Sequence, residues 1–122
     1  MNENLAVKQR FAGALQRLDG DFELLCEMAA VTLPDCPDVL ARIQNDLDAD
    51  DSAKAASSLH KLKGMLSTYE TDGVVIEIQE MLAMARRGNL EELKVLFAKE
   101  LPRIEALIQE IQVLCDHANS NA

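Results

Sequence analysis

Aromatic residues are scarce in this chain: it has three phenylalanines, one tyrosine and no tryptophan, which is 3% of its 122 residues. A core must therefore be built from Leu, Ile, Val, Ala and Met. Because strands favour β-branched and aromatic residues, this shortage favours helices over sheets. The hydrophobic share of 48% is ordinary for a globular protein and excludes a wholly disordered chain.

Positive charge is also in short supply. Lys and Arg number 12 against 21 Asp and Glu, which gives a net charge of −9. Binding to a phosphate backbone needs a basic face, so we expect no nucleic-acid partner. No apolar run approaches the roughly 18–20 residues that span a bilayer, and the first residues lack the layout of a signal peptide. We therefore expect a cytoplasmic protein with no membrane partner.

Candidate metal and redox sites are weak. Three cysteines is an odd number, and none of them forms a Cys-x-x-Cys pair, so reduced thiols are expected rather than disulfides or a zinc site. An acidic run, Asp46, Asp48, Asp50 and Asp51, lacks the glycine and glutamate of a calcium-binding EF-hand loop. A solvated helix end explains this run better, and Asp50 or Asp51 can cap the helix that follows. We expect no metal site and no cofactor.

Helical spacing of apolar residues recurs along the chain, and no segment keeps the two-residue period of a strand. At this length a single domain is expected, spanning residues 1–122. The predicted fold is all-α: an antiparallel four-helix bundle with an additional N-terminal helix, over about residues 4–115. The small polar residues 116–122 predict a frayed tail.

Several residues predict where helices begin, bend or end. The N-terminal helix is expected over residues 4–18, and its predicted buried positions are Leu5, Phe11, Leu15 and Leu18. Asp21 is a plausible N-cap of the next helix, which Pro34 and Pro37 should kink or split. The final helix should end near residue 115, with a kink at Pro102.

One of only two histidines, His60, lies in the middle of a helix expected over about residues 51–68. At 100° per residue, the apolar stripe is centred about 140° from His60. Its members are Ala55, Leu59, Leu62 and Leu66. The residues closest to His60 on the helical wheel are small: Ala53, Ala56, Gly64 and Ser67, with Ser57 slightly further round. The imidazole is therefore expected on an open face that another protein can approach.

The neighbours of His60 suit a phosphorylated ring. Lys63 lies one turn along the helix, Lys61 adds a second cation, and Gly64 removes a side chain that would lean over the imidazole. A mid-helix glycine costs roughly 1 kcal/mol relative to alanine, which suggests that bulk is unwelcome there. A neutral imidazole nitrogen is a competent nucleophile near neutral pH. The alternative is an ordinary surface histidine beside solubilising lysines.

The segment His60-Lys61-Leu62-Lys63-Gly64 resembles the His-x-Leu-Lys-Gly signature of histidine-containing phosphotransfer (HPt) domains. The resemblance extends over roughly residues 15–112, and includes Gly20–Leu25 and Ala85–Asn89. It implies a small helical bundle in which His60 is the phosphoacceptor and Lys63 the cation beside the phosphate. The partner-binding residues that it implies are Ala56, Ser57, Lys61, Gly64 and Ser67. Two positions depart from the family pattern: Glu70 replaces a frequent glycine, and Leu82 replaces an acidic residue.

The resemblance also implies partners and a mechanism. The partners would be receiver domains of a hybrid sensor kinase or a response regulator, and Mg²⁺ would lie in the receiver. The chain would relay a phosphoryl group between receiver aspartates in a two-component phosphorelay. It has no glycine-rich nucleotide loop, so no ATP-dependent kinase activity is expected. The alternative function is a non-catalytic helical adaptor or dimerisation bundle.

Overall fold

A computed structural model describes residues 3–120, and in that range it contains helices and no strand. The α-helices are α1 (Glu3–Arg10), α2 (Ala12–Arg17), α3 (Phe22–Thr32), α4 (Cys36–Asp48), α5 (Ser52–Leu66), α6 (Val74–Arg86) and α7 (Leu90–Ser120). A short 3₁₀ helix, η1 (Leu33–Asp35), joins α3 to α4. The predicted all-α class is confirmed.

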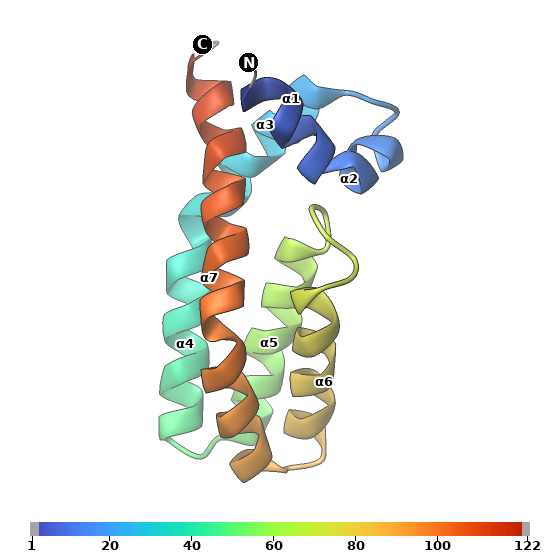
Figure 1. Ribbon diagram of the computed structural model, residues 1–122. Helices are drawn as coiled ribbons and strands as arrows, with labels where there is room; N and C mark the ends of the chain where they lie inside the picture. The colour runs from blue at the N-terminus through green and yellow to red at the C-terminus, as the bar shows by residue number, and fades with distance from the viewer. Residues whose placement is uncertain (1–2, 121–122) are drawn as a thin grey trace.

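Helices α4 to α7 form the bundle, and short connections make successive helices antiparallel (Figure 1). Helix α5 packs against α4 and α6, whereas α7 packs against α3 and α6. Helix α7 therefore lies across the bundle from α5. The same helix runs the length of the molecule, with α4 beside its first half and α3 beside its second half (Figure 1). The predicted four-helix bundle with extra N-terminal helical structure is present.

The N-terminal segment is two helices rather than the single helix predicted over residues 4–18. The chain turns at Phe11, whose backbone angles (φ −107°, ψ 30°) are not helical. The Phe11 ring is buried there and meets the Tyr69 ring edge to face, with 6.2 Å between the ring centres. Leu5 was expected in the core and is 54% exposed, while Val7 and Ala14 are buried instead. Burial of the phenylalanine ring against the bundle accounts for the break.

Helix ends follow the predicted signals at most positions. The Asp21 carboxylate accepts the Leu24 N–H at 3.0 Å, and the Asp51 carboxylate accepts the Lys54 N–H at 3.0 Å, so both aspartates are N-caps. Pro34 lies in the 3₁₀ helix η1, and Pro37 lies in the first turn of α4. The helical segment that runs from α3 into α4 is interrupted at these prolines, as expected.

The predicted end near residue 115 is wrong, because α7 continues to Ser120 through the segment predicted to fray. The His117 ring meets the Phe22 ring edge to face at 5.7 Å, which ties this last part of α7 to α3. Residues 121–122 lie outside the described residues. Pro102 lies inside α7, and the chain continues beyond this proline as the same helix.

The core of the bundle is almost entirely aliphatic. Its largest fully buried side chains are Phe11, Leu25, Ile43, Leu47, Leu59, Leu62, Leu66, Ile78, Met81, Leu82, Leu93 and Ile104. One buried carboxylate, Glu100, is paired with Arg103 one turn along α7. Among the side chains of residues 5–117, no buried nitrogen or oxygen lacks a hydrogen-bond partner. A core of this kind holds α5 in one orientation, so its outer face is fixed as well.

Candidate functional site

Helix α5 places the site because its inner face is fully buried. Asp51 starts the helix, and the four predicted core positions, Ala55, Leu59, Leu62 and Leu66, each have 0% exposure. Ser58 adds a hydrogen bond across to α4, where its hydroxyl donates to the Asp46 carboxylate at 2.9 Å. These contacts fix the rotation of α5 about its axis.

His60 lies on the outer face of α5 and is exposed. The residue one turn further, Gly64, is also exposed, and a Cβ built at that position meets nothing within 4 Å. Ser57 is exposed and Ala56 is half-buried. Both side chains are small, so neither adds bulk beside the imidazole ring. The approach to His60 is open.

The outer face of α5 is also cationic. Residues 52–66 include Lys54, Lys61 and Lys63 and no Asp or Glu, in a chain with 21 acidic and 12 basic residues. Lys61 is exposed and Lys63 is half-buried. Among the described side chains neither lysine forms a salt bridge, so both ammonium groups are available to an incoming anion.

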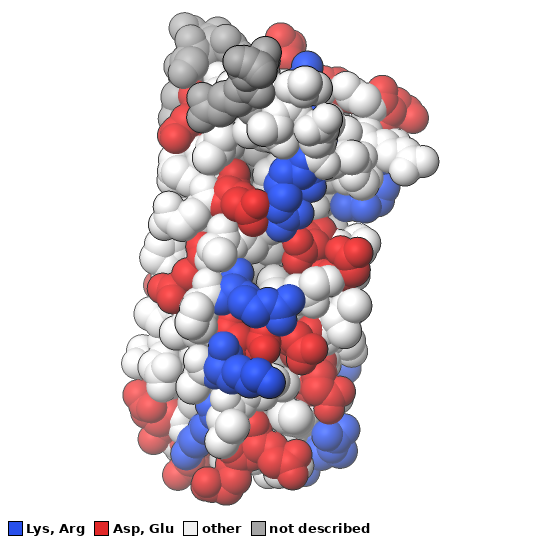
Figure 2. Space-filling model, viewed as in Figure 1, with Lys and Arg blue, Asp and Glu red and all other residues white. Residues whose placement is uncertain are grey.

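The far side of the molecule has a different charge pattern. Figure 2 shows the side that carries α7, where basic and acidic side chains are interspersed. Two of the basic groups on α7 are paired: Lys94 with Asp50 and Arg103 with Glu100. The cationic face of α5 is therefore a local feature and not a general property of the surface.

Ser67, the C-cap residue of α5, is half-buried and engaged in hydrogen bonds. Its hydroxyl donates back to the Lys63 carbonyl at 2.5 Å, and its own carbonyl accepts from the Arg17 guanidinium at 3.5 Å. The same guanidinium nitrogen donates to the Thr68 carbonyl at 2.9 Å. Sequence reasoning missed Arg17, because no local pattern links α2 to a helix end 50 residues later.

Glu70, the first departure from the HPt pattern, holds the connection between α5 and α6. One carboxylate oxygen accepts from Arg10 of α1 at 2.7 Å, and the other accepts the Val74 N–H at 3.1 Å, at the first residue of α6. Gly73 has φ +57°, and a Cβ there would lie 2.7 Å from the Glu70 carboxylate. The hydrogen bond from Arg10 to Glu110 is the main reason that the pKa of Arg10 is raised above its ordinary value. Glu70 is therefore a structural residue of this connection.

Leu82, the second departure, is 1% exposed and belongs to the core. An acidic side chain would need a partner at that depth, since burial of an unpaired charge is strongly unfavourable. The leucine therefore contributes packing between α6 and the rest of the bundle, and it adds nothing to the outer face of α5.

Other reactive groups lie away from this face. All three cysteines are buried, and burial raises the pKa of the Cys26 and Cys36 thiols, which keeps them protonated near neutral pH. Among the side chains of residues 5–117, no group of three or more His, Cys, Asp or Glu is arranged to hold a metal ion. Over the described backbone, residues 3–120, no helix is both long and apolar enough to cross a bilayer.

Comparison with known proteins gives a single assignment. The family model described as the Hpt domain matches residues 27–114, which is most of the chain and includes α5 with His60. The match begins within α3 and leaves out α1 and α2. No curated protein and no solved structure matches the chain. On the strength of the family match and the helical bundle, this chain belongs to the Hpt domain family of phosphotransfer modules.

Proposed function

We propose that His60 is the phosphoacceptor of this domain and relays a phosphoryl group between aspartates of two receiver domains. The observation that carries the proposal is the exposed imidazole on a helix face with no acidic residue, beside the open space at Gly64. Hpt domains act in phosphorelays, and His60 is the only histidine of α5. The other histidine, His117, packs its ring against Phe22 and is half-buried.

The transfer is a displacement at phosphorus. The lone pair of Nε2 of the neutral imidazole attacks the phosphorus of the aspartyl phosphate, while Nδ1 keeps its proton. The P–O bond to the aspartate breaks, and the carboxylate leaves with that electron pair. In the onward step a carboxylate oxygen of the second receiver attacks phosphorus, the P–N bond breaks, and the imidazole is regenerated.

Groups of this chain assist both steps by position and charge. Lys63 lies one turn from His60, where its ammonium group can approach the phosphoryl oxygens, and Lys61 adds positive charge nearby. Gly64 leaves space for the phosphoryl group and for the receiver surface that delivers it. The receiver supplies its acidic pocket and Mg²⁺, which neutralises charge on the transferred group. We propose no cofactor for this chain itself, and no phosphorylation directly from ATP.

The docking surface proposed here is the outer face of α5. It includes Ala56, Ser57, Lys61, Gly64 and Ser67. The first four lie beside His60 on the helix, whereas Ser67 lies about two turns away, where its carbonyl also holds Arg17. Small side chains allow close approach of a receiver, and the lysines match the acidic surface around a receiver's phosphorylation site.

Incubation with receiver domains labelled by radioactive acetyl phosphate tests the proposal. Wild-type protein should gain label that is labile in acid and stable in base, as phosphohistidine is. His60→Gln should gain none, and His117→Gln should behave as wild type. Equal, low labelling of wild type and His60→Gln would contradict the relay and favour a non-catalytic helical adaptor.

A further inference from the structure

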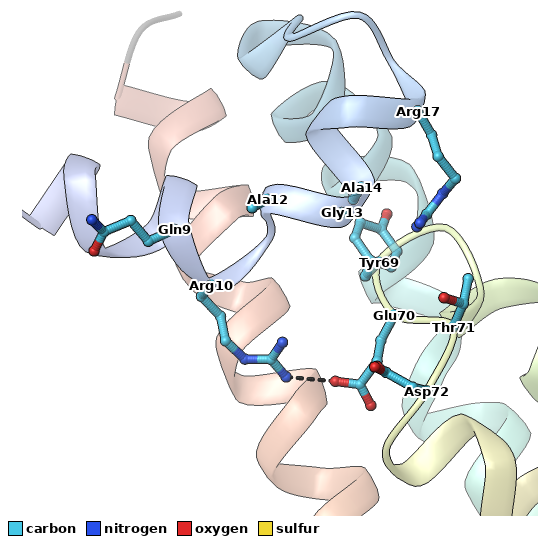
Figure 3. Close-up of a pocket in the computed structure, with 10 residues that line it drawn as sticks. All are labelled: Gln9, Arg10, Ala12, Gly13, Ala14, Arg17, Tyr69, Glu70, Thr71 and Asp72. Atoms are coloured by element: carbon cyan, nitrogen blue, oxygen red, sulfur yellow. Dashed lines mark hydrogen bonds and ion pairs between the residues drawn. The ribbon is translucent and has the colours of Figure 1, made fainter.

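Arg17 of α2 connects the N-terminal helices to the end of α5. Its guanidinium donates to the carbonyls of Ser67 and Thr68, and the residue is exposed. Figure 3 shows the Arg17 side chain reaching from α2 towards the connection between α5 and α6. An open pocket of about 320 Å³ lies beside it, between α1–α2 and the connection from α5 to α6. A guanidinium has five N–H donors, so the two carbonyl contacts through one nitrogen leave other donors free for a ligand.

The position of Arg17 relative to His60 follows from helix geometry. Arg17 donates to Thr68 at 2.9 Å and to Ser67 at 3.5 Å, just after the end of α5. If the turn of α5 is continued, Ser67 lies about 20° to one side of His60 and about 10 Å along the axis, and Thr68 lies about 80° to the other side and about 12 Å along it. The guanidinium, held at the Ser67 and Thr68 carbonyls, therefore lies on the same side of α5 as His60. A typical protein interface buries about 800 Å² on each partner, equivalent to a disc of about 16 Å radius. A receiver centred on His60 would therefore cover Arg17.

Charge favours this contact. Arg17 extends a face on which α5 supplies lysines and no carboxylate. A receiver domain that brings its acidic phosphorylation pocket to His60 also brings the acidic rim of that pocket. An exposed cation at the edge of an interface mainly speeds association and selects partners by charge.

We propose that Arg17 belongs to the receiver docking surface, where it contacts an Asp or Glu at the rim of the receiver's acidic pocket and sets the rate of productive encounter. This inference rests on the proposed function of His60. Arg17 lies outside residues 27–114, so the family match does not include it. It would add a cation from outside the matched residues to the docking charges that α5 already supplies.

Rates of phosphoryl transfer from labelled receiver domains test the role of Arg17. We expect Arg17→Glu to lower the second-order rate constant about tenfold at low ionic strength, and Arg17→Ala to lower it about threefold. Arg17→Lys, which keeps the charge, should remain within about twofold of wild type. The differences should shrink near 1 M salt, where the screening length falls to about 3 Å. Lys99→Glu makes the same charge change at an exposed position on α7, across the bundle, and should leave the rate unchanged.

Phosphoramidate, a small phosphodonor that needs no docking surface, separates docking from structural damage. Wild type, Arg17→Glu and Arg17→Ala should take up phosphate from it at equal rates. Equal loss with phosphoramidate and with receivers would show that Arg17 acts through the fold, which would overturn the inference. So would receiver transfer to Arg17→Glu at the wild-type rate, and in that case the role of His60 would stand. No receiver-dependent labelling of wild type would overturn both proposals.

Discussion

The inner face of α5 is closed and its outer face is open, although both belong to the same 15 residues. On the inner face Leu59, Leu62 and Leu66 are fully buried, and any loss of volume leaves a cavity. On the outer face His60 is exposed and a side chain added at Gly64 would meet open space. The inner face should therefore determine stability, and the outer face should determine phosphoryl transfer. Substitutions on each face can separate these two properties.

Loss of the nucleophile should give the largest functional effect. His60→Gln should abolish phosphate uptake from receivers, because glutamine has no nucleophilic ring nitrogen. Its free energy of unfolding should stay within about 0.5 kcal/mol of wild type, as is usual at exposed positions. Uptake assays and urea unfolding measure the two quantities. If His60→Gln unfolded at a much lower urea concentration than wild type, the outer face of α5 would also contribute to stability. That result would contradict the division between the two faces.

The opposite result is expected on the inner face. Leu66→Ala should lower the free energy of unfolding by about 2–5 kcal/mol, because the side chain is fully buried. That is a large part of the roughly 5–15 kcal/mol that stabilises a typical domain. Transfer per folded molecule, measured well below the melting temperature, should stay close to wild type. A transfer rate that falls while the protein remains folded would contradict this separation.

Substitutions at Gly64 should affect stability and phosphoryl transfer in opposite directions. Gly64→Ala should stabilise the protein by about 1 kcal/mol, because alanine is the better helix former and its Cβ has free space. Gly64→Leu should also keep the helix stable, but it should slow transfer from receivers about tenfold, equivalent to about 1.4 kcal/mol. The reason is that helical side chains lean towards the preceding turn, so a leucine at this position would lie over His60. Thermal melts and transfer rates report the two effects. Wild-type transfer by Gly64→Leu would mean that the space beside His60 is not used.

The smallest effect is expected at Lys63. Lys63→Met keeps the apolar stem and removes the ammonium. Transfer should slow about threefold to tenfold, since a solvent-exposed charge pair contributes up to about 1 kcal/mol. The difference should narrow as salt is added. Rates at low and high ionic strength provide the measurement. A rate equal to wild type at low salt would remove Lys63 from the mechanism.

The α5 region was predictable because its determinants are local. A cap at Asp51 and an apolar stripe at helical spacing define which way the helix faces, and the exposure of His60 follows from that rotation. The same local logic gave the N-cap at Asp21 and the split at Pro34 and Pro37.

The N-terminal region was predicted less well because its determinants are distant in sequence. Phe11 contacts Tyr69, Arg10 contacts both Glu70 and Glu110, and Arg17 contacts the end of α5. The spacing of apolar residues within 4–18 carries no information about these long-range contacts. It therefore predicts one continuous helix with Leu5 in the core. The end of α7 was misplaced for the same reason, since the helix that packs beside it, α3, is distant from it in sequence.

The central claim is that the phosphoryl group is carried on the outer face of α5, at Nε2 of His60. NMR of the imidazole nitrogens in ¹⁵N-labelled protein, recorded before and after phosphorylation by a receiver, tests it directly, with His117 as the internal reference. The expected result is a large shift of the His60 Nε2 resonance, while both ring nitrogens of His117 keep theirs. Phosphate incorporation with unchanged His60 nitrogens would contradict the claim.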